Sequence, residues 1–293
     1  MEGRILITVG RGRYVVRHRP LDGAGIRISH GPACSPVGPP VRNVSSPPRT
    51  EHAPGKIREM SLRHDVVFLF DVDNTLLDND RVTADLRRHL TGAFGPECAE
   101  GYWTIFEELR AELGYADYLG ALQRFRMQRP REPNLLAVST YLVNYPFANR
   151  LYPGSLDVLD HCRQWGPVVI LSDGDVVFQP RKVERSGLWD AVEGNVLIYI
   201  HKEEMLDDVE ARYPARHYVM VDDKLRILDA MRAAWGRRLT TVFPRQGHYA
   251  LDPEILTRYA PADVTLERIG ELADLQLSQI ITPEAAARVS GGS

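Results

Sequence analysis

The chain has 293 residues, of which 44% are hydrophobic and 26% charged, and its formal net charge is -3. This composition is ordinary for a soluble globular protein, and the length allows a full hydrophobic core. No apolar run approaches the length that spans a bilayer, so we expect no membrane partner.

The cysteines exclude a disulfide framework. Cys34, Cys98 and Cys162 are an odd, scattered set without a CxxC pair or a metal-ligand spacing. Such usage is typical of a reducing compartment, and we therefore predict a cytoplasmic protein without disulfides.

The first 64 residues differ in charge and composition from the rest. Residues 1–64 hold 11 Lys and Arg against 4 Asp and Glu, a net charge of +7, so the remainder carries -10. They also hold 8 Pro and 8 Gly, a composition that buries too little apolar surface to order itself. We predict a disordered basic tail with one short strand within residues 3–19. The favoured interpretation is that the tail is a spacer, or that the start site is assigned too far upstream and Met60 is the initiator. Binding of the tail to nucleic acid or to a transit receptor is the less favoured alternative.

Strand and helix patterns then follow in order. DVVFLFD, residues 65–71, is typical of a strand buried on both faces, and helical spacing continues without a strand-like run over about residues 81–144. SLDVLDHCRQWG predicts a helix ending at Gly166, and RKVERSGLWD one ending at Gly187. Further strands are predicted in PVVILSDGD, AVEGNVLIYI, HYVMVDD, RLTTVFP and the start of ADVTLERIGELADLQ, whose remainder predicts a helix.

This alternation predicts an α/β fold, a Rossmann-like parallel sheet core with an inserted helical domain. We assign residues 65–78 and 150–276 to the core and residues 79–149 to the insertion. Residues 1–64 and 277–293 are assigned to the two tails. Ligands of open parallel sheets bind at the carboxyl ends of the strands, so the insertion is a candidate lid over the site.

Polar side chains follow four of the predicted strands. In chain order these are Asp71 and Asp73; Ser172, Asp173 and Gly174; Lys202; and Asp222 and Asp223. Clustered carboxylates need a cation, and hard oxygen ligands suit Mg²⁺, which completes its shell with water and a substrate phosphate. A lysine, a hydroxyl and the backbone N–H groups that follow it can hold phosphate oxygens. One aspartate can attack phosphorus while a second protonates the leaving oxygen. The residues predict a phosphoryl-transfer site.

The order DVDNT, LSDG, a lysine and VDD resembles the haloacid dehalogenase-like (HAD) superfamily of hydrolases over about residues 66–276. The helical insertion is similar to the helical, C1-type cap of that family. The resemblance implies Asp71 as nucleophile and metal ligand, and Asp73 as general acid and base that also gives the metal its main-chain carbonyl. It implies Ser172 and Lys202, with Asp173 and Gly174 in the same motif, as the phosphate-binding residues. Asp223 is implied as a metal ligand, with Asp222 as a ligand or a partner of one.

Two positions depart from the pattern. Asn74 stands where many members have Gly, but Asn tolerates a left-handed backbone. Glu203 follows Lys202 where Pro is frequent, which leaves Lys182 as a rival for the phosphate lysine. His248, in the loop after the fifth strand, could reach the mouth of the site, but we assign it no role.

The predicted function is Mg²⁺-dependent hydrolysis of a small phosphorylated metabolite through an aspartyl-phosphate. A phosphomutase and a 2-haloacid dehalogenase of the same fold stay open as alternatives, although the dehalogenase members lack the second aspartate of DVDNT. A receiver domain fits less well, because its phosphorylated aspartate follows the third strand, where this chain offers a lysine. We do not expect nucleic acid as a partner. A nucleotide, a sugar phosphate and phosphoglycolate are all compatible substrates.

Overall fold

The structure is a computed structural model that describes residues 4–9, 12–17 and 63–281. The chain forms two compact units, Met1–Ile57 and Arg58–Ser293, and each is described by itself.

The first unit contains a β-hairpin. Strands β1 (Arg4–Val9) and β2 (Gly12–Arg17) pair antiparallel, with Val9 opposite Gly12. We predicted one strand here and the structure has two, because two β-branched runs follow each other closely enough to pair. The disorder predicted for the rest of the tail falls on residues outside the described ranges.

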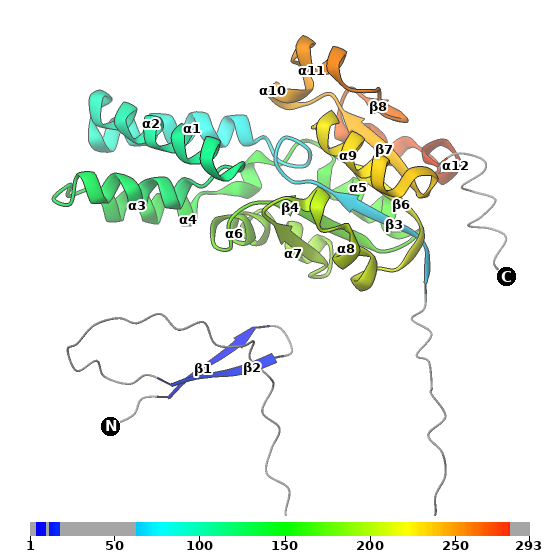
Figure 1. Cartoon of the computed structure of the whole chain (residues 1–293), viewed down its shortest axis with the longest axis horizontal. Coiled ribbons are helices and arrows are strands. Elements are labelled where there is room, and N and C mark those ends of the chain that lie inside the picture. The colour runs from blue at the N-terminus through cyan, green and yellow to red at the C-terminus, as the bar shows by residue number, and fades with distance from the viewer. Residues whose placement is uncertain (1–3, 10–11, 18–62, 282–293) are drawn as a thin grey trace, which may run out of the picture. The chain divides into compact units, whose positions relative to one another are not determined.

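A six-stranded parallel sheet forms the centre of the second unit (Figure 1). Its strand order is β5-β4-β3-β6-β7-β8, and every neighbouring pair is parallel. The strands are β3 (His64–Phe70), β4 (Val168–Asp173), β5 (Val196–Tyr199), β6 (Ala215–Val221), β7 (Leu239–Pro244) and β8 (Val264–Leu266). The predicted parallel α/β fold class is confirmed. β3 lies between β4 and β6, so the ends of these three strands meet at one edge of the sheet.

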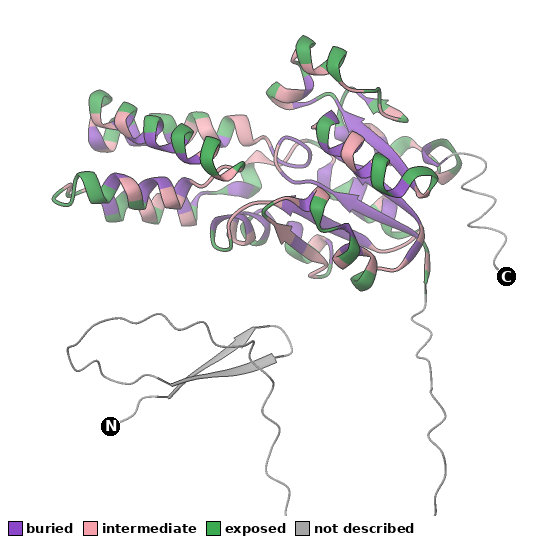
Figure 2. Ribbon diagram, viewed as in Figure 1, coloured by how far each residue is buried: buried purple, intermediate pink, exposed green. Residues whose placement is uncertain are grey.

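Both faces of the sheet are covered by helices. Phe68 and Phe70 of β3 enter a core shared with α5 (Ser155–Arg163), α6 (Phe178–Arg185) and α7 (Leu188–Ala191). Val67 and Leu69 enter the opposite core, with α8 (Leu206–Arg212) and α9 (Leu225–Trp235). Alternate side chains of a strand point to opposite faces, which explains why the run VVFLF is buried throughout (Figure 2).

Four helices lie in the chain between β3 and α5. They are α1 (Asn79–Phe94), α2 (Pro96–Leu113), α3 (Tyr118–Gln128) and α4 (Leu135–Asn144), followed by the 3₁₀ helix η1 (Phe147–Arg150). Figure 1 shows them as a lobe beside the carboxyl edge of the sheet. Tyr102 and Phe125 are buried between them, edge to face at 6.2 Å between ring centroids. Their apolar residues belong to the same cluster as α5 and α6, so this lobe packs against the core without a break.

The remaining segments correct three details. The helix expected to end at Gly166 ends at Arg163, and Gly166 is needed for another reason: a Cβ there would lie 2.1 Å from the Val66 carbonyl oxygen. The last predicted helix is a 3₁₀ helix, η4 (Ile269–Asp274). Beyond residue 276, where we began the tail, α12 (Leu277–Ile280) follows with Ile280 buried, so folded structure extends further than predicted.

The other short elements are η2 (Lys202–Glu204), η3 (Gly236–Arg238), α10 (Gly247–Ala250) and α11 (Pro253–Arg258). Among the described residues, no helix is both long and apolar enough to cross a membrane.

Candidate active site

The loop after β3 carries the first two aspartates. The Asp71 N–H donates to the Val221 carbonyl at 3.0 Å, which continues the β3–β6 ladder and fixes Asp71 beside the end of β6. Asn74 has a φ of 61°, so the left-handed turn predicted for it is confirmed. Its Oδ1 accepts the N–H groups of Asn79 and Asp80, at 3.0 and 3.2 Å, and so caps the start of α1. The chain therefore turns sharply from the sheet into the helical lobe directly after Asp73.

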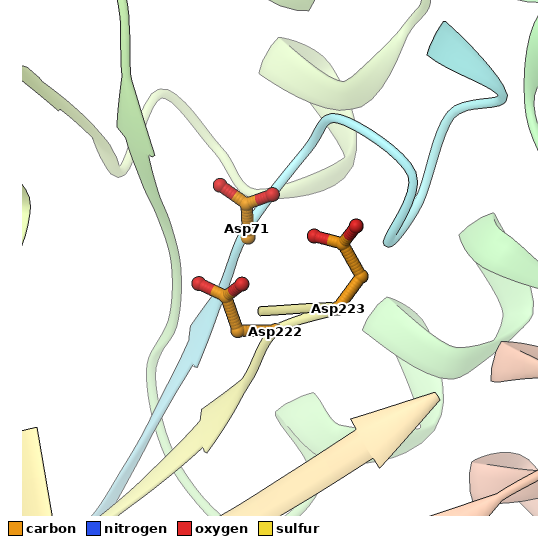
Figure 3. Close-up of side chains that lie close together, drawn as sticks. All are labelled: Asp71, Asp222 and Asp223. Atoms are coloured by element: carbon orange, nitrogen blue, oxygen red, sulfur yellow. The ribbon is translucent and has the colours of Figure 1, made fainter. Parts of the chain in front are cut away.

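Asp71, Asp222 and Asp223 converge at the ends of β3 and β6 (Figure 3). Each is buried, and each offers one oxygen so that the three atoms lie within 4.8 Å of one another. The Asp223 N–H donates to Thr75 Oγ1 at 3.0 Å, which ties the second strand end to the first loop. Within residues 63–281, no hydrogen-bond donor reaches Asp71 Oδ2 or either carboxylate oxygen of Asp223.

Burial acts on the titration of these carboxyl groups. It raises the pKa of Asp222 to about 6, and it raises the pKa of Asp223 well above its usual value. The neighbouring aspartates add to both shifts, because like charges disfavour ionisation. A bound cation would reverse the direction of these shifts.

Lys202 is the cation of the cluster. Its ammonium group is fully buried, 2.5 Å from Asp71 Oδ1. It also lies 2.7 Å from Asp222 Oδ2, as an ion pair that does not have hydrogen-bond geometry. Burial alone would lower the Lys202 pKa, but the surrounding carboxylates raise it above its usual value, so the side chain is charged. The three carboxylates outnumber Lys202 and Lys224, whose charge also acts on them, and the remaining negative charge suits a divalent cation.

The LSDG segment lies beside Asp71 and the loop that carries Lys202. Ser172 Oγ donates to Asp71 Oδ1 at 3.3 Å, and so lies beside the proposed nucleophile. Asp173 Oδ1 accepts the Lys202 N–H at 2.7 Å and thus positions the loop that carries the lysine. The Gly174 N–H donates to the Tyr199 carbonyl at 2.9 Å, so the β4–β5 ladder extends one residue beyond Asp173. The assignment of Gly174 to phosphate binding stays a prediction.

Asp73 is held from helix α6. Lys182 Nζ lies 2.5 Å from Asp73 Oδ1 and 3.1 Å from Asn79 Oδ1. Gln179 Nε2 lies 3.4 Å from Asp73 Oδ2 and 3.0 Å from Ser172 Oγ. Lys182 and Gln179 are buried, whereas the Asp73 side chain is 24% exposed. The rival lysine is therefore in the site, but its partner is Asp73.

A cavity of about 720 Å³ opens between the helical lobe and the core. Asp73, Asp173, Gln179 and Lys182 are among its core-side lining residues. Phe106, Arg110, Tyr115 and Tyr118 line it from the helical lobe. This volume is within the range of small-molecule sites and leaves room beyond the carboxylates for the body of a substrate.

Two contacts join the helical lobe to α10 across the mouth of the cavity. His248 Nδ1 lies 2.6 Å from Asp80 Oδ1, and the Arg110 guanidinium donates to the Tyr249 hydroxyl. Burial opposes the shift, but hydrogen bonds from His248 and Asn74 hold the Asp80 pKa below its usual value. His248 does reach the mouth of the site, as the sequence suggested.

The residues missed by sequence reasoning are Gln179 as a site residue and the pair Arg110 and Tyr249. Gln179 and Lys182 are three apart on a helix and share a face with apolar Phe178 and Val183, so two polar residues on a buried face were the available signal. Arg110 and Tyr249 are 139 residues apart, and no local pattern connects them.

The donor set fits a hard divalent cation. Buried carboxylate oxygens without donors, from Asp71 and Asp223, are expensive unless a cation binds them. All the candidate ligands are oxygens, as Mg²⁺ prefers. Asp71, Asp222 and Asp223 are therefore the residues that could hold it.

Comparison with known proteins agrees with the fold. The sequence model of the haloacid dehalogenase-like hydrolases matches residues 66–234. A crystal structure described as a haloacid dehalogenase-like hydrolase, from Burkholderia xenovorans LB400, is 68% identical. The match covers 73% of this chain and 99% of that one, with a TM-score of 0.70. The chain belongs to the haloacid dehalogenase-like hydrolases.

Two more distant structures are also similar to the chain. The L-2-haloacid dehalogenase of Xanthobacter autotrophicus is 20% identical, with 71% and 97% of the two chains covered and a TM-score of 0.49. A HAD hydrolase of Bacillus subtilis, described as bound to magnesium, is 18% identical, with 72% and 98% covered and a TM-score of 0.48. Neither similarity is close enough to bear on the reaction. No curated protein sequence matches the chain.

Proposed function

We propose that the protein is a Mg²⁺-dependent hydrolase of small phosphomonoesters. The observation that carries the proposal is the cluster of Asp71, Asp222 and Asp223, with buried carboxylate oxygens that have no donor, beside the Lys202 ammonium. Such a cluster at the end of a parallel sheet is suited to binding a cation and a phosphoryl group together.

In the first step, an Asp71 carboxylate oxygen attacks phosphorus and the bond from phosphorus to the leaving oxygen breaks. Asp73 gives its proton to that oxygen, so an alcohol leaves and Asp71 carries the phosphoryl group. Lys202 and Ser172, both in contact with Asp71 Oδ1, are placed to hold phosphoryl oxygens. When bound, the cation supplies charge that offsets the negative charge of the phosphoryl group.

In the second step, Asp73 accepts a proton from water as the water oxygen attacks the phosphorus. The bond between phosphorus and Asp71 breaks, which releases inorganic phosphate and restores both aspartates. The 24% exposure of Asp73, on the wall of the cavity, gives water access to it.

Asp73 also favours this reaction over dehalogenation. Halide leaves without a proton, so a dehalogenase needs no acid at this position, whereas an alkoxide needs one. A buried lysine and a buried glutamine both contact the Asp73 carboxylate. Halide release would not require an acid oriented in this way.

The test is release of inorganic phosphate from a panel of phosphomonoesters, with Mg²⁺ or with EDTA, by the wild type and by Asp71→Asn. We expect release with Mg²⁺, none with EDTA, and a loss of about 10³-fold or more in Asp71→Asn without a change in fold by circular dichroism. Substantial turnover by Asp71→Asn would remove Asp71 as the nucleophile. Chloride release from 2-chloropropionate, with no phosphate release from the panel, would establish the dehalogenase instead.

A further inference from the structure

Helix α6 directs two buried polar side chains at Asp73, and neither has a role in the reaction as derived so far. Gln179 is 3% exposed and the Lys182 side chain 1% exposed, although both are long and polar. They are three residues apart and so share one face of the helix. A buried ion pair adds little to stability, so the fold alone does not explain them.

We infer that Lys182 and Gln179 are positioning residues for Asp73, an inference that rests on the proposed function. Lys182 holds one carboxylate oxygen at 2.5 Å, and Gln179 reaches the other at 3.4 Å. Two donors on different oxygens fix the rotation of the carboxyl group, which a single donor would leave free. The plane of the group is thereby set for proton transfer within the cavity.

The same two residues connect Asp73 to its surroundings on both sides. Lys182 also donates to Asn79 Oδ1 at 3.1 Å, at the start of the helical lobe. Gln179 also donates to Ser172 Oγ at 3.0 Å, and Ser172 donates to Asp71. The acid/base carboxyl is therefore oriented relative to the nucleophile by one continuous set of hydrogen bonds. The Lys182 ammonium lies where negative charge develops as Asp73 releases its proton.

This role differs from that of a phosphate ligand in a way that kinetics can measure. A group that acts through Asp73 matters when the leaving oxygen is a poor leaving group and needs a proton. It matters little when the leaving group is p-nitrophenolate, which departs without one. A phosphate ligand would serve both substrates equally.

The experiment compares wild type, Lys182→Met and Lys182→Arg on an alkyl phosphomonoester and on p-nitrophenyl phosphate, with p-nitrophenol followed in the first turnover. For Lys182→Met we expect kcat on the alkyl ester to fall about 100-fold, with KM and the first-turnover release of p-nitrophenol within about threefold of wild type. Lys182→Arg, which keeps the charge, restores part of the lost kcat. The matched control is Arg185→Met, which removes an exposed cation from the same helix and leaves both substrates unaffected.

A double-mutant cycle keeps the test decisive if Lys182→Met alone is unstable because it leaves Asp73 without its partner. Added to Asp73→Asn, Lys182→Met should change kcat by no more than about threefold, because nothing remains for it to position. A large further loss in that background would overturn the inference, as would an equal loss of first-turnover release from both substrates or a large rise in KM. A wild type that releases no phosphate from any ester would instead refute the proposed function itself.

Discussion

Lys202 and Lys182 each form an ion pair with a different aspartate of the loop after β3. The two ammonium groups are buried, and each lies 2.5 Å from one carboxylate, Lys202 from Asp71 and Lys182 from Asp73. From sequence the two lysines were alternatives for a single role, because local pattern gives no information on which carboxylate each would meet. Only the packing of α6 against the β3 loop distinguishes them.

Asp223 differs from Asp71 and Asp222 because it has no hydrogen-bonded or ion-paired side chain among the described residues, although the charge of Lys224 acts on it. Among the described residues neither of its carboxylate oxygens accepts a hydrogen bond, and burial raises its pKa. A carboxyl whose pKa is raised on folding favours the folded state most below the unfolded pKa of about 3.8. That contribution is lost as the pH rises above this value, so the ionised group destabilises the fold near neutral pH unless a cation binds.

We therefore predict that Asp223→Asn raises the free energy of unfolding in EDTA at about pH 8, by about 1 to 3 kcal/mol. The difference between variant and wild type should shrink as the pH falls toward about 4. Adding Mg²⁺ should stabilise the wild type, by about 2.7 kcal/mol at 100 times its Kd, but not the variant. Thermal unfolding with EDTA or Mg²⁺ at several pH values measures all three effects. Equal stabilisation of both proteins by Mg²⁺ would exclude Asp223 as a ligand.

At the scale of elements, the strands could be predicted from the sequence, but the contacts between their ends and other elements could not. Strands β3, β4 and β6 are buried on both faces, so their unbroken apolar runs identified them, and a polar residue marked each end. Gly174 shows why, since a glycine after a strand is consistent with a phosphate loop and also with a close approach of another element. The close approach is what the structure shows: a Cβ at Gly174 would lie 2.6 Å from the Gln179 Cβ.

This contact predicts that Gly174→Ala displaces α6 and weakens catalysis. The added methyl group should lower the free energy of unfolding by about 1 to 3 kcal/mol and shift Gln179 from Ser172 and Asp73. We expect kcat to fall about tenfold or more, since small misplacements at a site are costly. Steady-state kinetics and thermal unfolding measure the two effects.

The control for this change is Gly187→Ala, at the other end of α6. A Cβ there meets nothing within 4 Å, and the φ of +84° makes the substitution costly only through the left-handed backbone. It should lower stability by about 1 kcal/mol and leave kcat unchanged. If both variants lost activity in proportion to stability, the Gly174 contact would have no specific role.

At the scale of the whole molecule, the cavity depends on residues that no sequence pattern connects. Its walls combine Arg110 of α2 with Tyr249 of α10, and the His248–Asp80 pair joins α10 to α1. The carboxyl-edge location of the site follows from the alternation of strands and helices, and sequence could predict it. Which side chains of the helical lobe face the site follows only from how the lobe packs.

The N-terminal 57 residues form a unit of their own, and the carboxylate cluster and the cavity described above are built from residues of the other unit. The family match begins at residue 66. The similarity to the Burkholderia protein includes 99% of that protein but only 73% of this chain. We predict that the chain from residue 58 onward keeps kcat/KM within about twofold of the full chain and unfolds at the same temperature.

The tail is basic and could attract nucleic acid electrostatically. If it has that role, its deletion should remove binding to nucleic acid and leave catalysis unchanged. Phosphate release, thermal unfolding and electrophoretic shift with DNA and RNA, run on both chains, separate these outcomes. Loss of phosphate release on deletion would mean that residues 1–57 complete the active site, and the cavity described above would then be only part of it.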